Sequence, residues 1–229
     1  MNHSRLSRIS KLAIAVCLSL LVGPVALAQS EYTGHKGSES LDETQPDPPQ
    51  WWLGVRLGFS FGGDNLITGT MNDGSTRTLD AGKGDIVTFN GSTAPWWISN
   101  AVGFGAGIEL GFKYGGISAS NGSASLMRYP LVGFLQALAR LSDNVYILAR
   151  GGIDKDLSVH LSGDGVLSNA KADFTSNVGL MGEIGIGYHY YSHLLFDATF
   201  RYTRVTYSIR GESFDGSNGG LMMGISFLF

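Results

Sequence analysis

The chain ends with Gly-Gly-Leu-Met-Met-Gly-Ile-Ser-Phe-Leu-Phe, residues 219–229. Every second residue, counted back from the last one, is apolar: Phe229, Phe227, Ile225, Met223 and Leu221. The residues between them are small or mixed in character. A period of two indicates a β-strand with two unlike faces. One face of this strand is therefore completely apolar, and the strand finishes on an aromatic residue.

The same alternation recurs from residue 51 onward. The clear runs are Trp51–Phe61, Val102–Tyr114, Val145–Ile153, Val178–Tyr190 and Phe196–Thr203. Each is close to the roughly 9–11 residues that a tilted strand needs to cross a bilayer. Residues 75–90 and 125–141 are weaker candidates. With the last strand they predict about eight strands, and bacterial barrels have an even number.

Two kinds of connection alternate between these runs. Polar segments rich in Gly, Asn, Ser or Asp, most of them long, occupy residues 72–74, 117–124, 162–176 and 211–219, whereas residues 142–144 and 191–193 are short. Outer-membrane barrels have short periplasmic turns and longer extracellular loops. The ends with short turns also carry the aromatic residues expected in a periplasmic girdle, namely Trp51, Trp52, Trp96, Trp97, Tyr188 and Tyr190.

Residues 51–229 resemble the small eight-stranded bacterial outer-membrane β-barrels. That group contains the transmembrane domain of outer-membrane protein A and the outer-membrane protein W family. The resemblance lies in the series of alternating strands, in the alternation of short and long connections and in the terminal Phe229. The resemblance implies an all-β fold, an eight-stranded antiparallel transmembrane up-and-down β-barrel surrounded by outer-membrane lipid and lipopolysaccharide. It also implies that Phe229 and Phe227 form the insertion signal for the barrel-assembly machinery. Periodicity alone also fits a soluble β-sandwich or a lipocalin-like barrel.

Residues 1–28 have the three parts of a secretory signal peptide. Basic residues precede an apolar run from Leu12 to Val22, and Ala26-Leu27-Ala28 forms a cleavage site. The apolar run is too short for a membrane anchor, which needs about 20 residues. We therefore expect cleavage after Ala28 and a Gram-negative outer-membrane location, with the new amino terminus in the periplasm.

Cleavage would change the composition of the chain. It removes Cys17, the one cysteine, and so excludes disulfides and thiol catalysis. It also removes three basic residues, which takes the formal net charge from −3 to −6. An acidic chain is a poor partner for nucleic acid. Residues 29–50 are polar and contain Pro46, Pro48 and Pro49, which predicts a disordered periplasmic tail before the barrel at 51–229.

Counting alternate residues assigns many polar side chains to the barrel interior. They are Arg56, Glu109, Lys113, Arg128, Gln136, Arg140, Arg150, Asp154, Glu183, Asp197 and Arg201. An eight-stranded barrel is just wide enough for side chains to fill it. Leaving a buried charge without a partner costs several kcal/mol of stability. We therefore expect an ion-pair network in the lumen, and the alternative is a binding site or a proton path.

One motif suggests catalysis. Lipid A deacylases with this kind of fold use a His and a Ser two residues apart on one strand, and His160-Leu161-Ser162 has that spacing. Residue counting puts His160 on the inward face with Arg150 and Asp154, however, and a lipid substrate needs an outward site. The histidines are scattered, and Asp154-x-Asp156 lacks the rest of a calcium loop. We expect no metal, no cofactor and no catalytic role.

These observations predict an integral outer-membrane protein with a structural role or a role of its surface-exposed loops. A porin-like conduit for small or hydrophobic solutes and a lipid-directed enzyme are the alternatives. The loops at 162–176 and 211–219 contain isolated apolar residues, Val166, Leu167, Phe174 and Phe214. Apolar groups on polar loops are candidate contacts for an extracellular ligand or host factor, and the alternative is that they simply pack within the loops.

Overall fold

The computed structural model describes residues 51–70, 74–119, 121–190, 193–209 and 211–229. The predicted signal peptide (1–28) and the predicted tail (29–50) lie outside these residues. Across the described ranges, no helix has the length and apolar character needed to cross a membrane.

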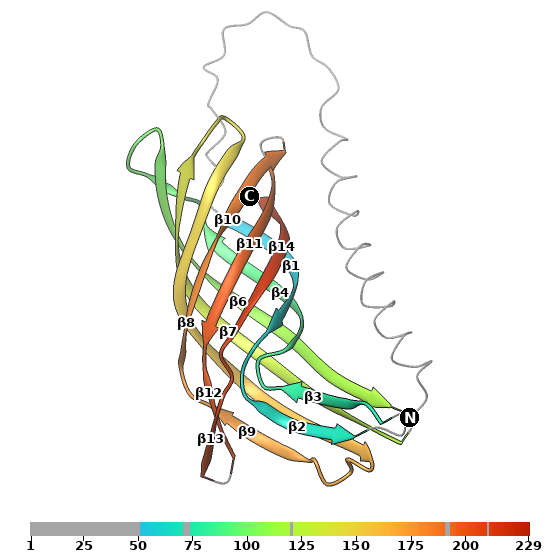
Figure 1. Cartoon of the computed structure of the whole chain (residues 1–229). Coiled ribbons are helices and arrows are strands. Elements are labelled where there is room, and N and C mark those ends of the chain that lie inside the picture. The colour runs from blue at the N-terminus through green and yellow to red at the C-terminus, as the bar shows by residue number, and fades with distance from the viewer. Residues whose placement is uncertain (1–50, 71–73, 120, 191–192, 210) are drawn as a thin grey trace, which may run out of the picture. The chain divides into compact units, whose positions relative to one another are not determined.

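Eight antiparallel strands close into a barrel (Figure 1). In chain order they are β1 (Trp51–Phe61), β4 (Gly84–Thr93), β6 (Val102–Ala119), β7 (Gly122–Arg140), β8 (Val145–Gly165), β10 (Gly179–Tyr190), β11 (Leu194–Arg204) and β14 (Asn218–Leu228). Each strand pairs with the next one in this order, and β14 pairs back onto β1. Closure leaves the barrel without an unpaired edge. The predicted fold, an eight-stranded antiparallel up-and-down barrel, is confirmed.

The two ends of the barrel differ, as the connections predict. One end carries Trp51, Phe229 and the short turns, together with β5 (Trp96–Trp97), which pairs with β6. The other end carries extensions beyond the barrel wall (Figure 1). These are the β2–β3 hairpin (Asn65–Thr70 and Thr76–Asp80) and the paired strands β9 (Ala172–Ser176), β12 (Thr206–Ile209) and β13 (Glu212–Asp215). We call the first end the turn end and the second the extension end.

The prediction that residues 117–124 and 162–176 are loops is largely wrong. β6, β7 and β8 contain 18, 19 and 21 residues and continue well into these segments. At about 3.3 Å per residue, β8 is far longer than the roughly 30 Å hydrocarbon core of a bilayer requires. Strand pairing is made by backbone hydrogen bonds and does not need an apolar face, so polar residues there are compatible with continued pairing.

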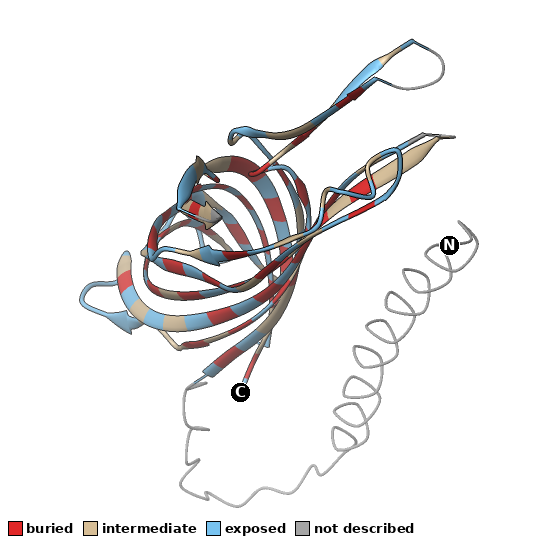
Figure 2. Cartoon of the chain, turned by 90° about the horizontal axis from the view of Figure 1, so that it is seen from below, coloured by how far each residue is buried: buried red, intermediate tan, exposed pale blue. Residues whose placement is uncertain are grey.

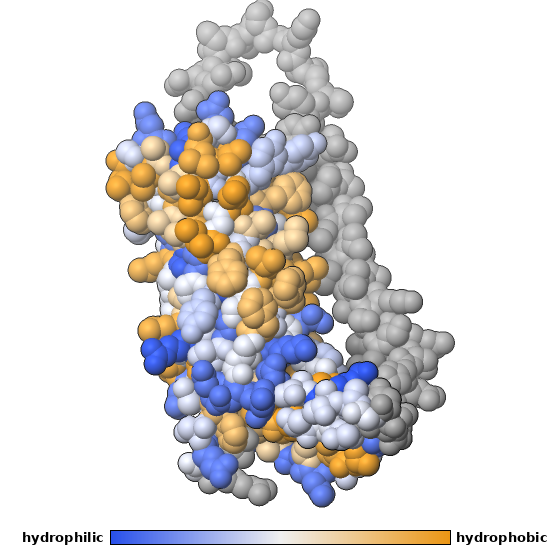
Figure 3. Space-filling view, viewed as in Figure 1, coloured by the Kyte–Doolittle hydropathy of each residue, from blue (hydrophilic) through white to orange (hydrophobic). Residues whose placement is uncertain are grey.

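Burial alternates along the barrel strands (Figure 2), and because successive side chains point to opposite faces, the buried residues are those on the lumen side. On β1, Leu53 and Leu57 face outward and are exposed, whereas Arg56 is fully buried. On β10, Ile184 and Ile186 are exposed beside a buried Glu183. This arrangement is the reverse of a soluble barrel. Apolar residues gather over the half of the surface near the turn end, and polar residues become frequent toward β2 and β3 (Figure 3).

The extension end has an apolar core, in contrast to the charged interior of the barrel. Apolar side chains from the β2–β3 hairpin, the long strands and β9 and β12 are buried together there: Leu79, Ala81, Ala124, Leu126, Val159, Phe174, Val205 and Tyr207. For Phe174 the structure favours packing within the extension over an exposed loop contact, because its side chain is buried and its ring packs against Tyr207 in this core. Val166 is exposed as expected, and Leu167 and Phe214 are half-buried.

Candidate functional site: the barrel lumen

The centre of the lumen holds an ion-pair network built on Arg56 of β1. Its guanidinium donates from Nη1 to Glu183 Oε2 at 3.0 Å and from Nε to Asp197 Oδ1 at 3.0 Å. Its Nη2 atom lies 2.8 Å from Glu183 Oε1 and donates to Thr199 at 2.6 Å. Arg56 therefore ties β1 to β10 and β11 across the interior.

Two further arginines complete the network. Arg201 of β11 forms a two-pronged contact with Glu109 of β6, with Nη2 2.9 Å from Oε2, and its Nε donates to Glu183 at 2.7 Å. Arg150 of β8 donates from Nη1 to Glu183 Oε1 at 3.1 Å. Three cations thus face three carboxylates, and Glu183 contacts all three arginines. Planar guanidinium groups suit such shared, forked contacts.

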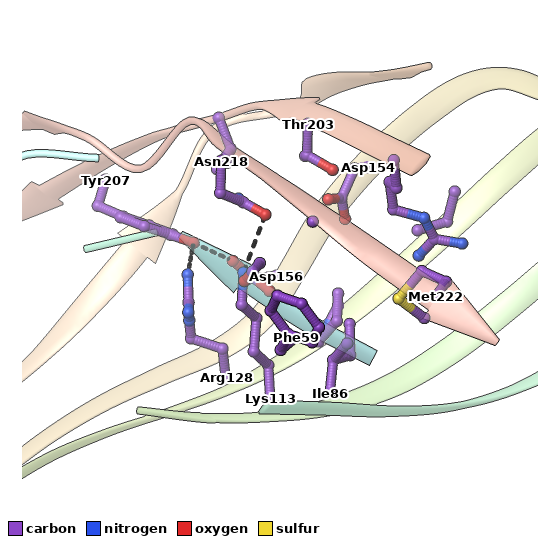
Figure 4. Close-up of a pocket in the computed structure, with 16 residues that line it drawn as sticks. Phe59, Ile86, Lys113, Arg128, Asp154, Asp156, Thr203, Tyr207, Asn218 and Met222 are labelled. Atoms are coloured by element: carbon purple, nitrogen blue, oxygen red, sulfur yellow. Dashed lines mark hydrogen bonds between the residues drawn. The ribbon is translucent and has the colours of Figure 1, made fainter. Parts of the chain in front are cut away.

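A second polar cluster closes the lumen toward the extension end (Figure 4). Arg128 donates from Nη1 to the carbonyl oxygen of Ala81 and from Nη2 to that of Lys83 at 2.8 Å. Lys113 donates to the carbonyl oxygen of Gly82 at 2.7 Å and to Asn218 Oδ1 at 2.9 Å. The turn between β3 and β4 is therefore folded over the mouth and held there by two cations from the barrel wall.

Tyr207 of β12 joins this cluster from the extension. Its hydroxyl donates to Asp156 Oδ2 at 2.5 Å and accepts from Arg128 Nη1 at 3.2 Å. Burial of the phenol, together with the neighbouring carboxylate of Asp156, raises the pKa of Tyr207 well above its usual range. The hydroxyl is therefore kept protonated and continues to link the extension to the barrel wall.

Between the two polar clusters lies a cavity of about 30 Å³. Lys113, Arg128, Asp154 and Asp156 line it together with apolar side chains from β1, β4 and β14. A volume of this size holds roughly two water molecules and no organic solute.

An apolar cluster closes the lumen at the turn end. It contains Trp52, Leu138, Tyr146, Leu148, Leu195 and Leu228, all buried. The prediction that Trp52 belongs to the periplasmic aromatic girdle is wrong. Neighbouring residues on a strand face opposite sides, and Trp52 is only 2% exposed. The other predicted girdle residues, Trp51, Trp96, Trp97, Tyr188 and Tyr190, are exposed at this end, as is Phe229.

The structure places most of the predicted lumen residues inside. Arg56, Glu109, Lys113, Arg128, Gln136, Arg150, Asp154, Glu183, Asp197 and Arg201 are all buried. Arg140 is the exception. It is the last residue of β7 and is exposed at the rim, where its guanidinium lies 4.7 Å from the ring centre of Trp97. The inward face ends at the mouth of the barrel, so a side chain there meets solvent and aromatic rings in place of the network.

The prediction that His160 faces the lumen is also wrong. The pairing of β7 with β8 shifts between Arg128 and Pro130, where β8 advances by one residue more than β7. This β-bulge places Leu157 and Ser158 together between the inward residues Asp156 and Val159. A bulge exchanges the two faces of the strand beyond it. His160 and Ser162 are consequently exposed on the outer surface.

Several residues of the site were not predicted. Asp156 and Tyr207 belong to the polar cluster at the mouth, but Tyr207 lies beyond the predicted strand and contacts residues remote in sequence. The carbonyl groups of residues 81–83 carry no side-chain signal at all. In the part of the chain that the structure describes, no group of His, Cys, Asp and Glu side chains could hold a metal ion.

Comparison with known proteins gives structural likeness only. No protein-family model and no curated protein matches the sequence. Neisserial surface protein A is 13% identical, with a TM-score of 0.49, over 78% of this chain and 97% of that one. Ail, the attachment invasion locus protein of Yersinia pestis, is 12% identical in its complex with the heparin analogue sucrose octasulfate, with a TM-score of 0.47, over 80% and 99%. The outer membrane protein OprG from Pseudomonas aeruginosa is 14% identical, with a TM-score of 0.42, over 80% and 97%.

Proposed function

We propose that this protein is an integral outer-membrane barrel whose lumen is closed to solutes and whose extension end carries its function. One observation carries the proposal: the barrel wall is apolar outside and charged inside. Exposed Leu, Ile, Phe and Met side chains cover the outer face of the strands, including Leu110, Leu135, Ile184, Phe200 and Met223. A surface this apolar is unfavourable in water and matches the hydrocarbon layer of a bilayer.

The aromatic residues give the barrel its orientation in this proposal. Trp and Tyr side chains favour the membrane–water interface, and Trp51, Trp96, Tyr188 and Tyr190 are exposed around the turn end. Short turns belong on the periplasmic side and longer connections outside. The extension end therefore faces the medium among the lipopolysaccharide headgroups, and the barrel-assembly machinery inserts the chain from the periplasm.

Charge substitution at two well-exposed apolar residues tests the membrane placement. Leu135 on the barrel wall is 71% exposed, and Val166 on the extension is 64% exposed. Arginine near the bilayer midplane costs about 2–4 kcal/mol, and close to nothing beyond the interface. We expect Leu135→Arg to lower the free energy of unfolding in lipid vesicles by about that amount, with Val166→Arg nearly unchanged. Equal effects at the two sites, or extraction of the protein without detergent, would contradict the proposal.

Electrical recording tests the closed lumen. The apolar cluster at the turn end, the arginine–carboxylate network and the folded-over β3–β4 turn each obstruct the interior at a different level. We expect little or no steady conductance in planar bilayers. Stable channels would favour the conduit in its place.

The expectation that the protein has no catalytic role rested in part on an inward-facing His160. Because the bulge in β8 turns His160 outward, its orientation no longer counts against catalysis. The extension end must therefore be considered both for binding and for chemistry.

A further inference from the structure

On the outer surface at the extension end, a serine, a histidine and an aspartate form a chain of hydrogen bonds, with the histidine in the middle. Ser158 Oγ lies 2.7 Å from His160 Nε2. The other ring nitrogen of the same histidine, Nδ1, lies 2.5 Å from Asp173 Oδ1. The three residues come from two neighbouring strands, β8 and β9.

Local backbone geometry builds this arrangement. His160 and Asp173 are direct cross-strand partners in the pairing of β8 with β9, so their side chains share one face. Ser158 lies in the β-bulge, two residues before His160 and outside the regular β7–β8 register. Bulges re-aim side chains, and this one directs the hydroxyl of Ser158 to the histidine.

The roles of the two ring nitrogens match a nucleophile–base–acid relay. In that relay a histidine Nε2 accepts the proton of a serine hydroxyl, and a carboxylate fixes the ring by accepting a hydrogen bond from Nδ1. The side chains of His160 and Asp173 are 47% and 83% exposed, so the site is open from outside the barrel. Such a relay is recognised by geometry and not by the order of its residues in the chain.

The position of the relay indicates the substrate. Leu157, next to Ser158 in the chain, is an exposed apolar residue, whereas Ser162 and Asp164 farther along β8 are exposed polar residues. The relay thus lies where an apolar outer surface gives way to a polar one, as acyl chains give way to headgroups. Two exposed cations, Lys155 just before Ser158 and Lys171 just before Asp173 in the chain, suit a phosphorylated headgroup.

We propose that Ser158, His160 and Asp173 form a hydrolytic site for acyl esters of outer-leaflet lipids with anionic headgroups. The proposal rests on the membrane placement of the barrel in the proposed function. It adds a reaction, which that function does not include.

The reaction balances with water as the only co-reactant. Ser158 Oγ attacks the ester carbonyl carbon while His160 Nε2 takes the hydroxyl proton. The carbon–oxygen bond to the lipid alcohol then breaks, and His160 returns the proton to the leaving alkoxide, which leaves an acyl-Ser158. Water attacks the carbonyl carbon of this ester while His160 Nε2 takes its proton. The bond between the acyl carbon and Ser158 Oγ then breaks, and His160 returns the proton to Oγ, so that a fatty acid and the free serine are released. Asp173 is a positioning residue that holds the imidazole ring and stabilises its protonated form.

The experiment uses the full mature chain folded in detergent micelles. Labelling by a fluorophosphonate probe and hydrolysis of a p-nitrophenyl acyl ester report the relay without a membrane. Vesicles of purified lipopolysaccharide or of anionic phospholipid, analysed by mass spectrometry for released fatty acid, then distinguish the two lipid sources. Ser158→Ala, His160→Ala and Asp173→Asn are compared with Ser213→Ala, which changes an exposed serine of β13 outside the relay.

We expect wild type and Ser213→Ala to be labelled and to release fatty acid from one of the two lipids. Ser158→Ala and His160→Ala should lose about 10³-fold or more of the rate, as relay variants do, and Asp173→Asn should lose rate while still being labelled, only more slowly. All variants should keep the heat-sensitive gel mobility of a folded barrel. The proposal is overturned if wild type is not labelled at Ser158, if Ser158→Ala keeps its activity, or if neither lipid is cleaved. Failure of the Leu135 and Val166 comparison, with esterase activity intact in micelles, would instead remove the membrane placement alone.

Discussion

Replacing Glu183 by glutamine should destabilise the barrel more than any other single polar substitution in the lumen network. Glu183 contacts Arg56, Arg150 and Arg201, and its carboxylate is buried. The network of three arginines with Glu109, Glu183 and Asp197 is balanced in charge. Glu183→Gln keeps the size of the side chain but leaves one positive charge uncompensated. Removing one partner of a buried pair costs about 3–5 kcal/mol, and we expect that loss in the free energy of unfolding.

Two control variants separate charge from other effects. Glu212→Gln makes the same change at an exposed residue of β13 and should stay within about 0.5 kcal/mol of wild type. Arg150 is the least satisfied cation, since its Nε and Nη2 atoms have no hydrogen-bond partner among the described residues. Its guanidinium lies 5.0 Å from the ring centre of Phe134. Adding Arg150→Met to Glu183→Gln removes the excess charge and should recover about 2 kcal/mol through this coupling.

Equilibrium urea titration in lipid vesicles, followed by tryptophan fluorescence, measures these differences. The slope against urea concentration should be the same for all variants, so that the midpoints compare stability. The reasoning is refuted if Glu183→Gln lies within about 1 kcal/mol of wild type. It is also refuted if Arg150→Met makes the Glu183→Gln variant less stable, because the excess charge would then not be the cause.

Three further predictions concern the ends of the molecule. Deleting Phe229 removes the backbone pair in which Phe229 N donates to Trp51 O at 2.9 Å and the predicted insertion signal, and should reduce the heat-sensitive folded band on gels. The pKa of Tyr207 is raised in the folded protein, so the stability that its protonated hydroxyl contributes is complete below about pH 10, the pKa of an unfolded tyrosine, and declines as pH rises further. Tyr207→Phe should therefore flatten the pH dependence of the free energy of unfolding above about pH 10. An unchanged pH profile in this variant would contradict the prediction. Intact mass of the protein purified from membranes should correspond to a chain that starts at Gln29 without lipid, and a lipid on Cys17 would contradict the predicted cleavage.

The strands and the lumen were predictable because both follow from counting alternate residues. Once Phe229, Phe227 and Ile225 are placed on one face, the same rule along β1 and β10 places Arg56 and Glu183 inside. Pairing of charges then follows from the cost of leaving them alone in the interior. The rule gives the face of a residue but not its height, so Arg140 was assigned to the lumen although it lies at the rim.

The extension end was not predictable in the same way. Residues 117–124 and 162–176 have the composition of loops, and that composition does not show that the β6–β7 and β8–β9 hairpins and the β7–β8 pairing continue through them. The burial of Tyr207 depends on contacts with Arg128 and Asp156, both more than 50 residues away. Such contacts are set by the closure of the barrel, which no local pattern describes.

The bulge in β8 explains why the predicted inward orientation of His160 was wrong. It also explains why the buried side of β8 is charged in the barrel and apolar in the extension. From Ile153 to Ser162 apolar and polar residues largely alternate in the sequence, and continuing that alternation would leave Val159 outside and His160 inside. The bulge adds one residue to β8, so the faces exchange where the strand leaves the apolar wall. Beyond it, Val159 points into the buried core of the extension and His160 points outward. With a single extra residue, one alternating sequence therefore forms both a barrel wall that is apolar outside and charged inside and an extension whose apolar residues are buried. The same bulge brings Ser158 to His160 at the boundary between the two.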